Sequence, residues 1–369
     1  MTAHAILGAS NAHRWLVCAG SVEAERDIPN TTSPFAEEGT RAHELGELAL
    51  LTSDAALDAF EDQEMAEFVR VYTDYVRQSA AGADVFEIEQ RVSYADWVEG
   101  GFGTADAVIV KDGVIHVCDL KYGMGVRVDA EENPQGMLYA LGAYAENSYL
   151  GGIHTAKISI IQPRLDHISE WEISIEALLR WAEWAKQRAE ATQDPDAPRV
   201  AGEKQCRFCR AKASCQALKD VTEAAIMSEF DDLDNMPKAN TLTEEQMRAA
   251  LDAKPMIESW LSAIEKLAKA RLEEGGGFVG YKLVEGRSNR LWISEDQASE
   301  ELVNLLGEED AYTKKLVSPA QAEKLLGKKR VSEIADIVVK SSGAPTLAPE
   351  TDKRPAINLT VDDFNDCID

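Results

Sequence analysis

Apolar and polar residues alternate in several short runs of the first half of the chain, and a period of two is typical of β-strands. We therefore predict strands over residues 85–94, 103–110, 114–121, 156–162 and 171–175. Longer segments between these runs carry the pattern of helices, which we predict over residues 10–27, 36–51, 61–80, 134–149 and 176–192. This order of elements predicts a mixed α/β domain, residues 1–228, in which helices flank a small central sheet.

The second half of the chain is expected to be organised separately. An acidic stretch, residues 229–241, is predicted to be a linker. Thr243 and Gln246 form a capping-box pattern, which predicts the start of a long helix that ends before a run of three glycines. This helix would open an accessory α+β region, 242–340, whose other elements are a short strand and two helices over residues 278–284, 295–306 and 318–326. The tail, 341–369, contains prolines and an acidic end and is predicted to be disordered.

Composition limits the compartment and the partners of the protein. Of the 369 residues, 45% are hydrophobic and 28% are charged, as in an ordinary soluble protein. No run approaches the roughly 18 apolar residues of a membrane-spanning helix, and the N-terminus lacks the pattern of a signal peptide. We therefore expect a cytoplasmic protein with reduced thiols and no membrane contact. The net charge of −27, from 38 basic and 65 acidic residues, argues against nucleic-acid binding except through a local basic groove.

One predicted hairpin aligns two carboxylates with an ammonium group. Asp112-Gly113 between two apolar runs is a strong signal for a two-residue type I′ turn. Counting back from that turn places Asp106 opposite Asp119, with Cβ atoms roughly 4.5–5.5 Å apart. Lys121 lies two residues beyond Asp119 and would therefore point to the same face of the hairpin. A slip of one residue in the register would reverse the face.

Two neighbouring carboxylates in a folded core need a counter-charge. Without partners they would cost several kcal/mol or take up protons. A hard divalent cation such as Mg²⁺ removes the conflict, because it takes one or two carboxylates together with water and phosphate oxygens as ligands. Lys121 would then stabilise negative charge on a scissile phosphate. The alternative is an edge hairpin whose polar ends are solvated and whose Lys121 pairs with an aspartate.

The cysteines indicate a second candidate site. Six are present, at positions 18, 118, 206, 209, 215 and 367. In a reducing compartment, Cys206 and Cys209 followed by Cys215 have the spacing of a metal site rather than of a disulfide. Thiolates suit either zinc or an iron–sulfur cluster, and the spacing does not choose between them. We interpret Cys118 as a buried strand residue and Cys367 as a free thiol in the tail.

These residues resemble the motifs of a nuclease superfamily. Asp106 in Gly-Thr-Ala-Asp and Lys121 in Asp-Leu-Lys are similar to the GxxD…(D/E)xK core of PD-(D/E)XK nucleases. The RecB-like branch adds two motifs with similar counterparts here, namely a G-x-x-x-H helix at Gly39 to His43 and a Q-x-x-x-Y pair at Gln135 and Tyr139. Cys18 with the three clustered cysteines resembles the pattern of AddB-type and CRISPR-associated RecB-like nucleases. A phage-encoded RecB-like family has a similar opening, Arg14-Trp15…Cys18-Ala19-Gly20-Ser21.

The resemblance, which covers roughly residues 10–218, implies a restriction-endonuclease-like core that hydrolyses DNA with the help of a metal. The expected ligands of Mg²⁺ or Mn²⁺ are His43, Asp106, Asp119 and the carbonyl of Leu120. The remaining catalytic residues would be Lys121, Gln135 and Tyr139. A [4Fe-4S] cluster with a structural role, in preference to zinc, would be held by Cys18, Cys206, Cys209 and Cys215. The implied activity is exonucleolytic cutting from single-stranded or duplex DNA ends.

Other functions are compatible with the same residues. One is a catalytically silent DNA-binding or assembly module on the same fold, although the intact set of His43, Asp106, Asp119 and Lys121 favours the enzyme. A zinc-bearing interaction protein would leave the paired carboxylates unexplained. We expect the enzyme to serve phage or bacterial recombination, replication or repair in the cytoplasm of a bacterial host. Its C-terminal region could contact a recombination or replication protein.

Overall fold

The computed structural model describes residues 5–29, 33–229, 243–276 and 280–284, together with Val303 and Arg330. The chain divides into two compact units, Met1–Leu283 and Val284–Asp369, and nearly all of the described residues lie in the first. Several predictions lie outside the described residues. These are most of the linker, the helices over 295–306 and 318–326, the tail over 341–369, and Cys367.

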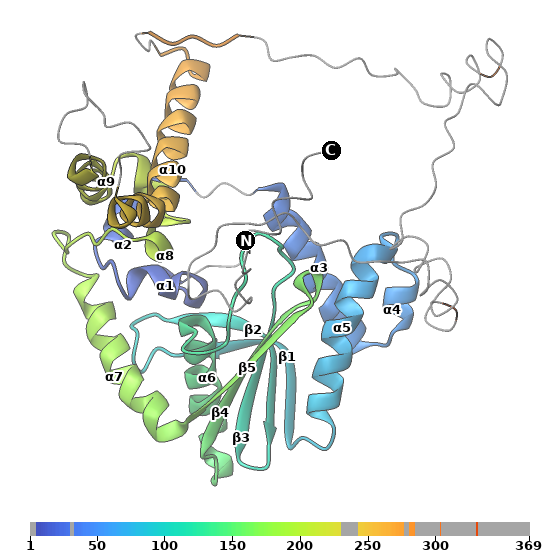
Figure 1. Ribbon diagram of the computed structural model, residues 1–369. Coiled ribbons are helices and arrows are strands. Elements are labelled where there is room, and N and C mark those ends of the chain that lie inside the picture. The colour runs from blue at the N-terminus through green and yellow to red at the C-terminus, as the bar shows by residue number, and fades with distance from the viewer. Residues whose placement is uncertain are drawn as a thin grey trace, which may run out of the picture. The chain divides into compact units, whose positions relative to one another are not determined.

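A five-stranded sheet forms the centre of the first unit (Figure 1). Its strands are β1 (Val85–Ser93), β2 (Phe102–Lys111), β3 (Val114–Leu120), β4 (Thr155–Gln162) and β5 (His167–Ser174). They lie in sequence order across the sheet, and neighbours are antiparallel except for β3 and β4. β3 and β4 are parallel, and the connection between them contains a helix, because parallel neighbours need a long crossover connection. The predicted mixed α/β fold is confirmed.

The predicted β2–β3 hairpin has the expected turn and register. Asp112 and Gly113 have φ angles of 51° and 76°, the positive values that both central residues of a type I′ turn adopt. From the turn, the ladder follows the predicted pairs as far as the position next to Asp106 on β2 and Asp119 on β3. These two aspartates therefore lie at the open end of the hairpin, where β2 and β3 part.

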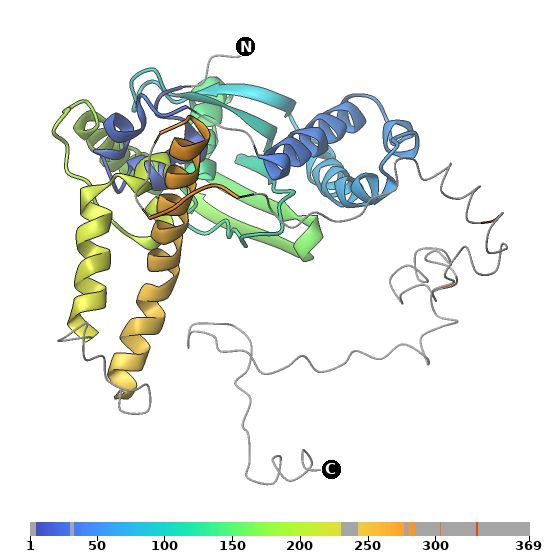
Figure 2. The ribbon, with the colours of Figure 1, turned by 90° about the horizontal axis from the view of Figure 1, so that it is seen from above.

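Helices cover both faces of the sheet and create two apolar cores (Figures 1 and 2). One face is covered by α6 (Pro134–Asn147) and α7 (Ile175–Ala191), and the other by α3 (Pro34–Leu51), α4 (Ala55–Asp58) and α5 (Gln63–Ala80). Successive strand residues point to opposite faces. Val108 of β2 therefore enters the core under α6, whereas Ile109 enters the core under α5.

Four long helices begin at side chains that cap their first turn. The oxygens of Ser33, Asp62, Asn133 and Ser174 each accept a hydrogen bond from a backbone N–H at the start of α3, α5, α6 and α7. Such caps satisfy backbone donors that have no partner within the helix. In α6 the cap also fixes the first turn, which carries Gln135. A Cβ at the neighbouring Gly136 would lie 2.5 Å from Ile158 Cγ2, so α6 rests directly on β4.

The N-terminal segment differs from the predicted helix over residues 10–27. It forms three short helices, η1 (Ala9–Asn11), α1 (Ala12–Trp15) and α2 (Ser21–Glu25). At the break, Gly20 donates its N–H to Pro198 O at 3.2 Å, and a Cβ at Gly20 would lie 2.3 Å from Ala197 O. The segment after α7 thus packs against the break, where Cys18 also lies.

The cysteine-rich segment and the predicted long helix complete the first unit. Its elements are α8 (Glu203–Cys206), η4 (Arg210–Ala213), α9 (Gln216–Glu229) and α10 (Glu244–Glu273). The helices α9 and α10 lie side by side (Figures 1 and 2). Because α10 packs against α9, it belongs to the first compact unit rather than to the accessory region predicted from residue 242.

The predicted strand over 278–284 is wrong in its described part. Residues 280–284 carry no strand, since they pair with none of the strands that the structure describes. In the described part of the chain, no helix is both long enough and apolar enough to span a membrane.

Candidate metal centre and cysteine site

Asp106 joins three elements at the end of the sheet. Its Oδ1 lies 3.3 Å from Nδ1 of His43 on α3. Its Oδ2 accepts a hydrogen bond of 2.6 Å from the N–H of Leu120, at the end of β3. Asp106 is only 8% exposed, so its carboxylate is held in one position by these contacts.

Asp119 and Lys121 form the other half of the site. Lys121 Nζ lies 2.9 Å from Asp119 Oδ1 and 2.7 Å from Oδ2. Gln135 on α6 connects the pair to the helix, because its Oε1 accepts from Lys121 Nζ at 3.1 Å and its Nε2 donates to Asp119 Oδ1 at 3.1 Å. The same Nε2 lies 3.3 Å from the hydroxyl of Tyr139 one turn later.

Glu89 is a site residue that no sequence motif indicated. Ligand atoms of His43, Glu89 and Asp106 all lie within 4.8 Å of one another. The β1–β2 ladder is regular on both sides of Glu89 and places it opposite Asp106. Its φ angle of 49° is unusual for a strand residue that is not glycine. The sequence could have indicated Glu89 only if the β1–β2 register were known, and the connection between these strands contains no short turn that fixes it.

The site concentrates like charges. Burial raises the pKa of Asp119; the charge of Lys121 lowers this pKa and that of Asp106 raises it further. Burial and the charge of Asp106 raise the pKa of Glu89 to about 7. Burial alone would lower the pKa of His43, but the charge of Asp106 and the hydrogen bond with it raise this pKa on balance. The carboxylates thus favour a nearby positive charge.

The donor set fits a divalent cation. Asp119 Oδ2 is buried and has no hydrogen-bond partner among the described residues, although its ion-pair partner Lys121 is close. A free lone pair on a buried carboxylate needs a partner. Carboxylate oxygens and an imidazole nitrogen are ligands that Mg²⁺ or Mn²⁺ accept.

The residues that the motifs indicated form two groups of contacting side chains. His43 contacts Asp106, and Asp119, Lys121, Gln135 and Tyr139 contact one another. The backbone of β3 links the groups, because Leu120 donates its N–H to Asp106, whereas the prediction for Leu120 concerned its carbonyl. Asp119 does not belong to the set of ligand atoms within 4.8 Å of one another. Glu89 extends the group of His43 and Asp106 on the β1 side.

The cysteine site lies where the break at Gly20 meets the segment after α7. Val200 donates its N–H to Cys18 Sγ at 3.2 Å, and Gly202 donates to Cys206 Sγ at 3.5 Å. Burial raises the pKa of Cys206, and the nearby charges of Cys215 and Cys18 raise it further.

Cys209 completes this group, because its pKa is also sensitive to the charge of Cys206. Burial and the charge of Glu25 raise the pKa of Cys209 to about 11. The four predicted cysteines therefore gather at one place. The fifth described cysteine, Cys118, is buried in β3 as interpreted.

The described cysteines do not form a three-ligand group as tight as the metal centre does. Among the described residues, three ligand atoms within 4.8 Å of one another occur at His43, Glu89 and Asp106, but not among the cysteines. Thiolates suit either zinc or an iron–sulfur cluster.

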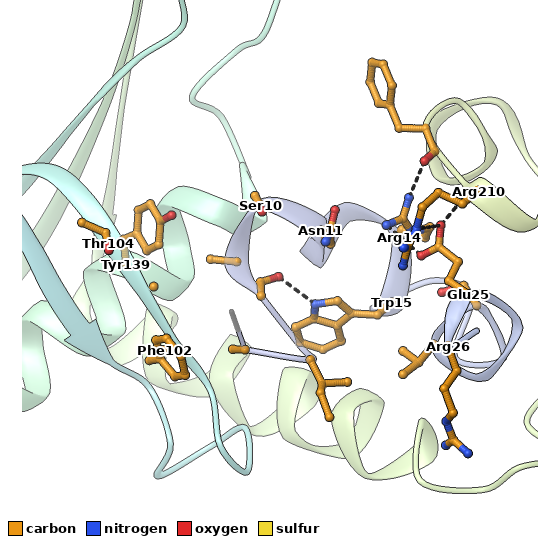
Figure 3. A pocket seen from close by; sticks show the side chains of 18 of the residues that line it. Ser10, Asn11, Arg14, Trp15, Glu25, Arg26, Phe102, Thr104, Tyr139 and Arg210 are labelled. Carbon is orange, nitrogen blue, oxygen red and sulfur yellow. Dashed lines mark hydrogen bonds and ion pairs between the residues drawn. The ribbon is translucent and has the colours of Figure 1, made fainter. Parts of the chain in front are cut away.

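A buried ionic network holds the cysteine loop against the N-terminal segment (Figure 3). Arg14, only 5% exposed, pairs with Glu25 at 3.0 Å. Arg14 also donates to Phe208 O at 2.9 Å, and Glu25 accepts the N–H of Arg210 at 2.6 Å. Phe208 lies between Cys206 and Cys209. These contacts fix the backbone of the cysteine loop.

Comparison with known proteins places the chain in a family. One solved structure, "Crystal structure of SSO0001", is similar over 59% of this chain and 89% of that chain, with 16% identity and a TM-score of 0.27. A TM-score this low is no evidence for a shared fold. The family described as "Protein of unknown function (DUF2800)" matches residues 4–355. Because this match covers nearly the whole chain, the protein belongs to the DUF2800 family.

Proposed function

We propose that the protein is a metal-dependent nuclease that removes nucleotides from DNA ends. The observation that carries this proposal is the convergence of His43, Glu89 and Asp106 to within 4.8 Å. Beside them lies the buried carboxylate of Asp119, paired with Lys121, whose ammonium group provides a fixed positive charge. This combination is what hydrolysis of a phosphodiester requires.

The cation would be held by His43, Glu89 and Asp106, with Asp119, also expected as a ligand, beside this group. When bound, Mg²⁺ or Mn²⁺ supplies activation of the attacking water and stabilises the charge that develops on the phosphate. The Leu120 N–H fixes Asp106 from the opposite side, so one oxygen of that carboxylate remains directed toward His43.

Lys121 supplies a positive charge that is already in place. Asp119 and Gln135 both contact its ammonium group, so it needs little reorganisation when a phosphate binds. Preorganised charges of this kind contribute strongly to catalysis. Gln135 also holds the hydroxyl of Tyr139, which would contact the DNA backbone. The side chain of Gln135 thus positions both groups.

The cysteines would hold a [4Fe-4S] cluster. Support comes from the proximity of the four cysteines, since the charges of Cys18 and Cys215 act on Cys206 and the charge of Cys206 acts on Cys209. The resemblance to cluster-bearing RecB-like nucleases favours iron–sulfur over zinc. Hydrolysis needs no electron transfer, so the cluster would act as a structural link between the N-terminal segment and the segment after α7.

The test is degradation of end-labelled DNA by anaerobically purified protein, with Mg²⁺, Mn²⁺ or EDTA. Asp119→Asn and Lys121→Met should each lower the rate by about 100-fold or more, because each removes a charge that acts on the transition state. The matched control is Asp112→Asn in the exposed hairpin turn, which should cut at the wild-type rate.

Two results would overturn the proposal. Consider protein that retains the visible absorbance of an iron–sulfur cluster. If it cuts no single-stranded or duplex substrate with either metal, the chain is a DNA-binding or assembly module rather than a nuclease. If cutting persists in Asp119→Asn, the hydrolysis occurs elsewhere. Cutting within closed circular DNA would contradict the exonuclease assignment.

A further inference from the structure

A cavity lies between the surroundings of the two candidate sites (Figure 3). Its volume is about 960 Å³. Thr104 and Tyr139 line it on the side of the metal centre, and Arg210 of the cysteine loop lines it on the other side. Phe208 of the same loop and the N-terminal segment around Ser10 are further parts of its lining. Tyr139, which contacts Gln135 of the metal centre, is the point at which a chain-like ligand in this cavity would come near that centre.

The cavity is basic although the protein is acidic. The whole chain has a net charge of −27, yet the cavity is lined by four arginines and a single glutamate. Arg14 and Arg210 neutralise that glutamate, Glu25, from both sides. Arg26 also lines the cavity, but it is ion-paired with Glu23 on α2. Arg91 lines the cavity as well and lies over the ring of Phe102. The local charge thus favours a polyanion.

Aromatic rings are interleaved with these charges. Phe208 is 64% exposed in spite of its fixed backbone, whose carbonyl Arg14 holds. Phe102 lies under the guanidinium of Arg91, with Cζ 4.0 Å from the ring centroid. An exposed ring on a fixed loop is suited to stack on a base, and basic grooves with aromatic rings are the usual surface for single-stranded nucleic acid.

We infer that this cavity binds a single strand of DNA, with Phe208 stacking on a base and Arg91 contacting a phosphate. The inference rests on the proposed nuclease function and names its substrate. A duplex cannot offer a base face to Phe208 in this way, because the faces of its bases are already stacked on one another. The cysteine site is then part of the substrate surface, since Cys206 and Cys209 determine where Phe208 lies.

The experiment measures binding separately from cutting. Fluorescence anisotropy of a labelled single-stranded oligonucleotide and of a blunt duplex is recorded with Ca²⁺ in place of Mg²⁺. Phe208→Ala should weaken binding of the single strand about tenfold, the loss expected for one stacked base. Phe208→Trp should restore it. Arg91→Gln should lower the slope of log Kd against log salt concentration by roughly the amount that one phosphate contact contributes.

Tyr149→Ala provides the matched control, because Tyr149 is 77% exposed but does not line the cavity. It should bind as the wild type does. Visible absorbance is compared among all variants, so that loss of the cluster is not mistaken for loss of stacking. Unchanged affinity of Phe208→Ala, or an equal loss for the duplex, would overturn the inference.

The same data separate the two proposals. If the wild type cuts DNA but its affinity does not depend on Phe208, the cavity assignment is wrong and the nuclease stands. If binding of the single strand depends on Phe208 but no metal supports cutting, the cavity assignment stands and the nuclease is wrong.

Discussion

Replacement of Glu89 by glutamine should stabilise the metal-free protein and weaken its binding of Mn²⁺. Ligand atoms of Glu89 and Asp106 lie within 4.8 Å of each other. Two unit charges at that distance repel by about 3.5 kcal/mol at an effective dielectric constant of about 20. The access of solvent to Glu89 reduces this to about 1–2 kcal/mol. Glu89→Gln removes the repulsion and keeps the shape of the side chain.

Mn²⁺ should cancel most of the stability that Glu89→Gln gains in the metal-free protein. A ligand at about 100 times its Kd raises the free energy of unfolding by about 2.7 kcal/mol. If Glu89 is a ligand, the variant binds about tenfold or more weakly and gains at most about 1.4 kcal/mol at the same concentration. The loss of metal binding thus offsets most of the gain in the metal-free state.

The assay is denaturant unfolding at pH 8 in EDTA and in Mn²⁺, followed by the fluorescence of the seven tryptophans, of which Trp15 is buried. Glu87→Gln is the matched control, since Glu87 lies on the same strand opposite Val108 rather than opposite Asp106. It should change the free energy of unfolding by less than about 0.5 kcal/mol in either condition. If Glu89→Gln destabilises the metal-free protein, or if Mn²⁺ stabilises both forms equally, Glu89 is no metal ligand.

Three further predictions test other parts of the molecule. Gly39→Ala should stabilise α3 by roughly 0.5–1 kcal/mol, because no atom lies within 4 Å of a Cβ there. Denaturant unfolding measures this gain, and a loss of stability would contradict the open space at this position. Burial and the charge of Lys157 lower the pKa of His116 to about 4, whereas an unfolded histidine has a pKa of roughly 6.5. The neutral imidazole therefore stabilises the fold fully above about pH 6.5, and this contribution is lost as the pH falls toward about 4. Denaturant titrations should show a loss of about 2 kcal/mol between about pH 7 and about pH 5 that is absent in His116→Asn. Cys215→Ser should purify without the visible absorbance of an iron–sulfur cluster, and retained colour would remove Cys215 from the ligand set.

The hairpin and its aspartates follow from local sequence. Asp112-Gly113 imposes a type I′ turn, and the turn sets the register that aligns Asp106 with Asp119. The Gln135–Tyr139 spacing likewise places both side chains on one face of α6. In each case a short-range rule of backbone geometry connects the residues, so no tertiary information is needed.

Other features depend on contacts between distant segments. Glu89 enters the site through the register of β1 against β2, and a long connection leaves that register undetermined by the sequence. The N-terminal helix breaks because residues 197–198 pack against Gly20, far away in sequence. The basic cavity is invisible in a net charge of −27, which sums over the whole surface. Local geometry thus determined the hairpin that carries the two aspartates. Only the packing of remote segments decided which further side chains surround it, because such packing depends on the whole fold.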